Sequence, residues 1–125
     1  MLLKPSMVVP GNEHAQQAQP AQVAAWTVRI LKRTVPAAVP GVFFLSGGQT
    51  PAEASAHLDA MNRLGTHPWQ LSFSYGRALQ DPAMQAWKGQ AGNARVTQNA
   101  LLKRARLNGA AREGKYSPAL EESAA

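Results

Sequence analysis

The sequence predicts an α/β fold in which parallel strands alternate with helices, and three observations carry this prediction. Residues 42–45 form an unbroken apolar run that ends at a Gly-Gly loop. A capped helix start follows that loop directly. Strand-like segments at residues 1–4 and 69–75 are likewise followed by helix-like segments. The resulting order of strand, helix, strand, helix, strand, helix is typical of right-handed βαβ units around a parallel sheet.

The first expected elements lie before that loop. Residues 1–4 are interpreted as the end of a short strand, and residues 5–19 as a loop. Pro20 opens a helix that ends before Pro36. Apolar side chains recur at helical spacing along this helix, so they are expected to form its buried face; they are Val23, Trp26, Ile30 and Leu31.

The central strand and its loop form the best-defined signal. The run at 42–45 is apolar throughout and rich in β-branched and aromatic residues, which favours a strand buried on both faces. After the Ser46–Gln49 loop, Thr50 can cap a helix, Pro51 fits its first turn, and Glu53 can complete a capping box. Glycine backbones and a helix N-terminus both favour bound anions, so this loop is expected to hold an anion such as phosphate.

The remaining elements follow in order. Residues 69–75 are predicted as a strand that Gly76-Arg77 closes. A short helix is expected at 81–87 and a longer one at 93–112. The segment 114–125 is small and polar, which predicts a flexible tail.

Composition narrows the classes of protein. The chain has 125 residues, 45% of them hydrophobic, which suits one domain with a core. It has no cysteine and no apolar stretch of membrane-spanning length, and its start, MLLKP, lacks the apolar core of a signal peptide. We therefore expect a cytoplasmic protein with no membrane partner.

The formal net charge of +6 invites anionic partners. No zinc-finger spacing or RNA-binding aromatic motif accompanies the basic residues near the C-terminus, so a solvated helix face is favoured and no nucleic-acid partner is expected. These residues are Lys103, Arg104, Arg106 and Arg112. A small nucleic-acid binder that uses them stays as a low-ranked alternative.

The histidines and tryptophans receive no chemical role. His14, His57 and His67 are scattered without metal-ligand spacing. The tryptophans are expected in core or packing positions; they are Trp26, Trp69 and Trp87.

Three parallel strands do not close a sheet, and a full (β/α)₈ barrel takes about 250 residues. Phosphate sites in such barrels often lie after strands seven and eight. If the Ser46–Gly48 and Gly76-Arg77 loops occupy these places, then Lys4 ends strand six. Residues 1–125 are thus expected to form a partial domain, the C-terminal part of a TIM barrel with strands 6–8 and their helices, incomplete in this chain.

The residues at the three strand ends suggest chemistry. A lysine that ends an apolar strand loses solvation, which favours the neutral amine, and a neutral amine can form a Schiff base with a carbonyl. That lysine is Lys4, while Arg77 can grip a phosphate through a bidentate fork. The plainer interpretations are a solvated lysine near a frayed terminus, a simple turn at Gly47-Gly48, and an ion pair between Arg77 and Asp81. A nucleotide P-loop is disfavoured because no Gly-Lys-Ser/Thr follows.

Four stretches resemble the C-terminal part of class I, Schiff-base fructose-bisphosphate aldolases. They are LLKPSMVVPG (2–11), RTVPAAVPGVFFLSGGQT (33–50), WQLSFSYGRAL (69–79) and KYSPA (115–119). The resemblance implies reversible cleavage of fructose 1,6-bisphosphate to dihydroxyacetone phosphate and glyceraldehyde 3-phosphate, a step of glycolysis and gluconeogenesis, with no metal or other cofactor. It implies that Lys4 forms the iminium. It also implies a site for the adjacent phosphate, made of Ser46, Gly47, Gly48, Gly76 and Arg77.

The chain also departs from that family. Ser6 stands where an asparagine usually follows LLKP, and the chain ends in Ala125 where some members end in a catalytic tyrosine. The family's acid/base residues and second phosphate site lie on earlier strands, so we expect little activity from this chain alone. The resemblance further implies a homo-oligomer in full-length form. The alternative function is a non-catalytic, phosphate-binding half-barrel that pairs with a complementary segment.

Overall fold

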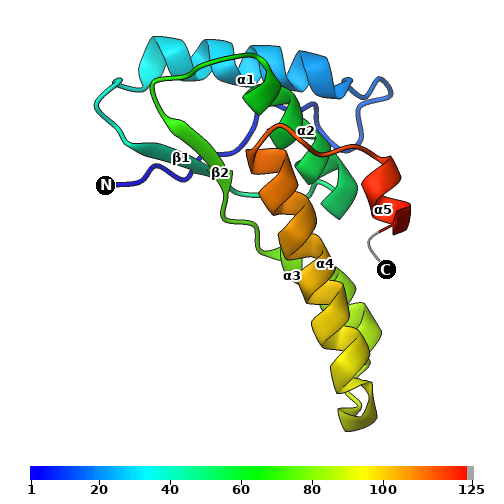
Figure 1. Cartoon of the computed structure of the whole chain (residues 1–125). Helices are drawn as coiled ribbons and strands as arrows, with labels where there is room; N and C mark the ends of the chain where they lie inside the picture. Colours follow the sequence, from blue (N-terminus) through cyan, green and yellow to red (C-terminus); the bar gives the residue numbers. More distant parts are fainter. Residues whose placement is uncertain (124–125) are drawn as a thin grey trace.

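A computed structural model describes residues 1–123 of the chain. Two parallel strands lie side by side, and helices precede, connect and follow them along the chain, as Figure 1 shows. In chain order the elements are α1 (Pro20–Thr34), β1 (Gly41–Phe44), α2 (Pro51–Arg63), β2 (Gln70–Phe73), α3 (Arg77–Trp87), the 3₁₀ turn η1 (Ala91–Asn93), α4 (Ala94–Arg112) and α5 (Ala119–Ser123). The α/β class is therefore as predicted, and so is the alternation of helices and strands from α1 onward.

The sheet pairs β1 with β2 in parallel, in a register that runs from Gly41 opposite Gln70 to Phe44 opposite Phe73. The strand predicted at residues 1–4 is wrong: only Leu3 pairs with β1, in an isolated parallel bridge. Proline explains this. The pairing reaches the Pro5 carbonyl, which accepts from the Leu45 N–H at 3.0 Å. Pro5 has no N–H, however, so it cannot donate the hydrogen bond to β1 that a continuous strand would need.

The core lies on one face of this sheet. Side chains alternate along a strand, so Val42, Phe44 and Leu71 point to the same face, where all three are buried. Helix α2 covers them with Leu58 and Met61, both without exposed surface. The prediction of a fully buried central strand is confirmed in its main part, with Phe43 and Leu45 on the other face only half-buried.

Helix α1 packs on α2 but with a different face from the predicted one. Val23 and Leu31 are buried as expected, whereas Trp26 and Ile30 are 44% and 46% exposed. The buried face is centred on Thr27, which can be buried because its Oγ1 accepts a hydrogen bond from the Val8 N–H at 3.0 Å.

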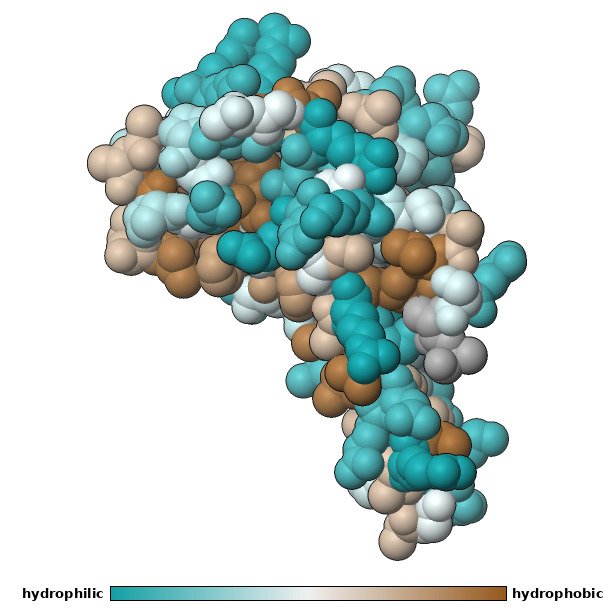
Figure 2. Space-filling model, in the orientation of Figure 1, coloured by the Kyte–Doolittle hydropathy of each residue, from teal (hydrophilic) through white to brown (hydrophobic). Residues whose placement is uncertain are grey.

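Helices α3 and α4 pack together as a hairpin that projects away from the sheet (Figures 1 and 2). Helix α4 matches its predicted bounds closely. Helix α3 begins at Arg77, four residues before its predicted start at 81, and carries Pro82 inside it. Trp87, at its end, is 40% exposed rather than packed, while Trp69 is buried as predicted.

The end of the described chain folds back onto the domain, which differs from the expected flexible tail at 114–125. Tyr116 is 3% exposed, and its backbone N–H donates to Asp59 Oδ1 at 2.8 Å. Helix α5 then lies beside α4 in Figure 1, where the Glu121 carboxylate pairs with Arg104. The last residue, Ala125, stands where some family members have a tyrosine, and it lies outside the described residues. Among the described helices, none has both the length and the apolar character needed to cross a membrane.

Candidate functional site

The carboxyl ends of the paired segments meet at one edge of the sheet. The bond from Leu45 N–H to the Pro5 carbonyl brings the end of the first segment beside the end of β1. On the other side of β1, the Ser74 N–H donates to the Phe44 carbonyl at 2.9 Å. Lys4, just before the end of the first segment, therefore lies near this edge, and so do the Ser46–Gly48 loop and Gly76-Arg77, which follow the ends of β1 and β2.

Lys4 is exposed in this structure, and the expectation of a desolvated lysine is wrong for it. The reason is its place in the pairing. Leu3 packs against the core, so strand alternation directs Lys4 to the opposite face of the sheet. That face bears Phe43 and Leu45 and is only half covered.

The Ser46–Gln49 loop is a tight turn. The Gln49 N–H donates to the Ser46 carbonyl at 3.0 Å, and Gly47 and Gly48 have φ of +56° and +81°. Two successive positive φ values occur readily only in glycine, which explains the Gly-Gly pair. Within residues 1–123, neither glycine N–H has a recorded partner, and both residues are exposed. Adjacent free backbone N–H groups in such a turn can bind an anion.

The second loop is also a helix start. Gly76 precedes α3, and its carbonyl accepts from the N–H groups of Leu79 and Gln80 at 3.1 and 3.0 Å. The N–H groups of Arg77 and Ala78 thus lie in the first turn of a helix, where they favour anions. The Arg77 side chain is exposed, and in the described part of the chain it forms no ion pair with Asp81.

The N-terminus of α2 is capped by side chains of the chain itself. The capping box is confirmed: Thr50 Oγ1 accepts from the Glu53 N–H at 3.2 Å, and Glu53 Oε2 accepts from the Thr50 N–H at 2.9 Å. The bond from the Thr50 N–H, and a second one in which the Thr50 hydroxyl donates to the same Oε2 at 2.9 Å, lower the pKa of the Glu53 carboxyl group, so it stays ionised. A carboxylate of the protein itself therefore already occupies this helix end.

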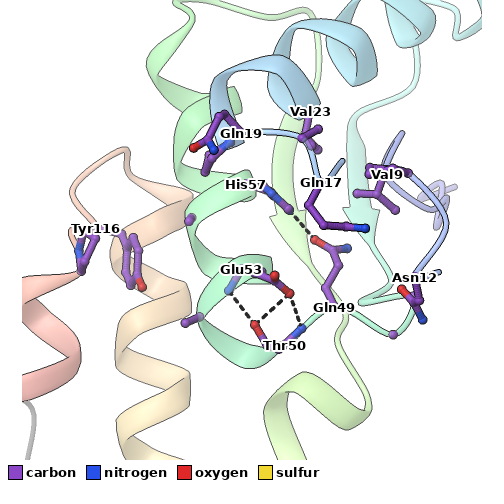
Figure 3. Close-up of a pocket in the computed structure, with 18 of the residues that line it drawn as sticks. Val9, Asn12, Gln17, Gln19, Val23, Gln49, Thr50, Glu53, His57 and Tyr116 are labelled. Atoms are coloured by element: carbon purple, nitrogen blue, oxygen red, sulfur yellow. Dashed lines mark hydrogen bonds between the residues drawn. The ribbon is translucent and has the colours of Figure 1, made fainter. Parts of the chain in front are cut away.

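A cavity of about 780 Å³ lies beside the Gly-Gly turn, between the loop at 9–20, the start of α2 and the segment at 116–122. His57 and Gln49 point toward one another in it (Figure 3), with Nδ1 and Oε1 2.6 Å apart. Burial lowers the pKa of His57, against the attraction of the nearby Glu53 carboxylate, so the ring is neutral at neutral pH. In the sequence analysis His57 was assigned no role because the three histidines are scattered without metal-ligand spacing. The contact with Gln49 has no sequence pattern by which it could have been found.

A second polar cluster, which lies around Arg104, was also missed in the sequence analysis. Arg104, expected on a solvated helix face, is 4% exposed and donates to the Glu121 carboxylate and to Ser55 Oγ. The Tyr116 hydroxyl donates to Glu121 Oε1 at 2.9 Å. Burial, first, and then this contact raise the pKa of Tyr116 to about 12. Arg106 and Arg112 are exposed as predicted.

Comparison with known proteins gives consistent findings. The family model described as "Glycolytic: Fructose-bisphosphate aldolase class-I" matches residues 1–125. The chain is 52% identical over 118 residues to fructose-bisphosphate aldolase B of Sparus aurata, covering 94% of this chain and 32% of that protein. It is 55% identical over 115 residues to fructose-bisphosphate aldolase 1 of Toxoplasma gondii, covering 92% and 32%. A solved structure of the Plasmodium falciparum aldolase, in complex with TRAP and a small molecule inhibitor, shares 50% identity and a TM-score of 0.89, covering 93% of this chain and 33% of that one. The chain thus spans about a third of the length of these relatives.

Proposed function

The chain belongs to the class I fructose-bisphosphate aldolase family, and on that basis we propose that its protein cleaves fructose 1,6-bisphosphate reversibly into dihydroxyacetone phosphate and glyceraldehyde 3-phosphate. The family match does not favour the alternative of a non-catalytic half-barrel. We further propose that the chain forms the C-terminal part of a TIM barrel, strands 6–8 with their helices. The match in fold to a third of a solved aldolase supports this placement.

Lys4 is proposed as the nucleophile. After loss of a proton, its amine would add to the ketone carbon of the substrate, and loss of water would then give an iminium. When the carbon–carbon bond breaks, the hydroxyl group on the departing carbon gives its proton to a base and becomes the aldehyde carbonyl, while the electron pair of the broken bond moves into the iminium and leaves an enamine. That base would come from the earlier strands, where the family's acid/base residues lie, and the aldehyde then departs. A proton then returns to the enamine carbon, and water releases the ketone. The position of Lys4 at the carboxyl edge of the paired segments supports this role.

The phosphate next to the ketone is proposed to bind between the two loops that flank Lys4. Ser46, Gly47 and Gly48 would supply a hydroxyl group and the free N–H groups of the turn. Gly76 and Arg77 would add the first turn of α3 and a guanidinium fork. The single observation that carries this proposal is the pair of backbone bonds, Leu45 to Pro5 and Ser74 to Phe44, that bring the end of the first segment and the ends of β1 and β2 to one edge.

The remaining expectations stay proposals. The protein is proposed to act on sugar phosphates without a metal, to form a homo-oligomer, and to work in the cytoplasm. We propose that residues 1–125 form one part of a single aldolase domain, and a complementary barrel segment is the proposed partner for this part.

The test is the intact mass of the purified chain after incubation with fructose 1,6-bisphosphate and borohydride, followed by peptide mapping. Borohydride reduces an iminium to a stable amine, so a sugar-phosphate adduct on Lys4 is the expected product, and a triose-phosphate mass would mean that the carbon–carbon bond is also broken. An unmodified Lys4, both in the chain alone and with the complementary barrel segment added, would overturn the proposed role.

A further inference from the structure

We propose that Gln49 and His57 are positioning residues that hold the Ser46–Gly48 turn in the shape that binds phosphate. This inference rests on the proposed function, since it concerns the same turn. Neither side chain is proposed to touch the substrate. They act through the Ser46 carbonyl group and through the backbone that follows it.

Gln49 closes the turn twice. Its backbone N–H donates to the Ser46 carbonyl at 3.0 Å, and its side-chain Nε2 donates to the same oxygen at 2.8 Å. Ser46 itself is 5% exposed, so this carbonyl group has little access to water as a replacement partner. The two bonds fix the end of the turn while the Gly47 and Gly48 N–H groups stay free for a ligand.

His57 fixes the side chain of Gln49 in turn. Because the Gln49 amide nitrogen donates to Ser46, its Oε1 is the group that faces His57, and an amide oxygen can only accept. The network therefore assigns the proton of the neutral imidazole to Nδ1, which donates to Oε1 at 2.6 Å.

The anchor of this chain of bonds is buried. His57 is 6% exposed, and its neighbour Leu58 has no exposed surface within the core cluster. The order of contacts therefore runs from the core, through α2, to His57, Gln49 and the Ser46 carbonyl. Two freely rotating glycines would otherwise be the most mobile part of the site, and an ordered turn binds its ligand with a smaller loss of entropy.

The substitutions follow from the roles of single atoms. Gln49→Leu removes both side-chain bonds at similar volume, and His57→Leu removes the donor to Oε1. His57→Asn keeps a donor, because the asparagine Nδ2 can occupy the place of the imidazole Nδ1. Gln85→Leu, on the exposed side of α3, is the matched control for adding an apolar side chain.

The first measurement is the affinity of each variant for inorganic phosphate and for dihydroxyacetone phosphate, followed by the amide signals of Gly47 and Gly48 in NMR titrations. We expect Gln49→Leu and His57→Leu to weaken binding about three- to tenfold, the value of one or two hydrogen bonds, with His57→Asn and Gln85→Leu near the original chain. Trapping at Lys4 is expected to need more substrate for half-saturation in the two weakened variants, with the same yield at saturation.

The second measurement needs no ligand. Hydrogen exchange of the Gln49 N–H reports directly on the turn, and we expect it to rise about three- to tenfold in Gln49→Leu and His57→Leu but not in His57→Asn. A general loss of folding would raise exchange at Leu58 as well, whereas a local role leaves Leu58 protected.

The outcomes separate the two proposals. If the original chain binds phosphate and all variants bind it equally, the positioning role is overturned and the proposed function stands. If the original chain binds no phosphate at this turn, the proposed function fails in this chain, and exchange at Gln49 then decides the positioning role. Unchanged exchange in both leucine variants overturns it.

Discussion

The guanidinium group of Arg104 and the carboxylate of Glu121 form a close ion pair, with Nη1 2.7 Å from Oε1 and 2.6 Å from Oε2. Nη2 of the same guanidinium donates to the Pro51 carbonyl at 2.7 Å and to Ser55 Oγ at 2.6 Å. Arg104 is almost fully buried, so its charge depends on these contacts. One side chain of α4 thus joins the start of α2 to α5.

We expect Glu121→Gln to lower the free energy of unfolding by about 2–3 kcal/mol, because the buried Arg104 loses the charge that compensates it. The estimate is below the full range for buried pairs, since the Glu121 side chain is 25% exposed. Urea denaturation followed by circular dichroism measures the change. The control is Glu113→Gln, which removes the exposed pair with Lys115 and is expected to leave the urea midpoint unchanged. Equal midpoints for the two variants would contradict the structural role of the Arg104 pair.

Phe44→Ala is expected to lower the free energy of unfolding by about 3–5 kcal/mol, because it opens a cavity under α2 in the central strand. Phe44 has no exposed surface, whereas Trp26 on α1 is 44% exposed. Trp26→Ala is therefore expected to cost clearly less, although it removes a larger side chain. Thermal denaturation of both variants tests this order, and a larger loss from Trp26→Ala would show that the α1 face is packed differently.

Stability is expected to depend on pH through His57. Its pKa in the folded chain lies below the usual 6.5, so the unfolded chain takes up a proton first as the pH falls. Unfolding then binds a proton, and the free energy of unfolding decreases from about pH 7 downward by at most about 1.4 kcal/mol per pH unit. His57→Asn lacks this proton and should show a flatter profile between pH 7 and 5. Parallel profiles would mean that the two states of the chain bind protons at His57 equally.

We expect Lys4 to be needed for the covalent step and Arg77 for binding of the substrate phosphate. Lys4→Met removes the amine and should abolish the borohydride-trapped adduct at any substrate concentration. Arg77→Ala should raise the substrate concentration for half-maximal trapping about ten- to hundredfold, the value of a charged hydrogen bond to phosphate, and leave the yield at saturation intact. Intact-mass measurements across a substrate series separate the two effects. An equal loss at saturating substrate for both variants would contradict this division.

The central strand, the Gly-Gly turn and the capped start of α2 could be predicted from the sequence because each follows from neighbouring residues. Thr50 and Glu53 are three positions apart, and their bonds need no other part of the chain. The positions of Lys4 and Arg104 could not be predicted in this way. Burial of Arg104 requires Glu121 and Ser55, which lie 17 and 49 residues away.

The strand predicted at residues 1–4 and the predicted start of helix α3 were both misplaced. In each case the cause is local, but the pattern of apolar residues does not show it. Residues 1–4 pair with β1 only at Leu3, because Pro5 lacks the donor for the next bond. Helix α3 runs through Pro82 from a start at Arg77, where Gly76 supplies the first accepting carbonyl. The candidate site residues themselves stay predictions, supported by their shared edge and by the family match.

The backbone contacts on either side of Lys4 also decide on which face of the sheet its side chain lies. Leu3 and Pro5 both bond to the strand beside them, which leaves the lysine between them on the alternate side. A slip of one residue would exchange odd and even positions, and the ammonium group would then point among Val42 and Phe44, at a cost of several kcal/mol for an unpaired charge. The spacing of two residues between these anchors therefore decides whether the amine faces solvent or the hydrophobic interior.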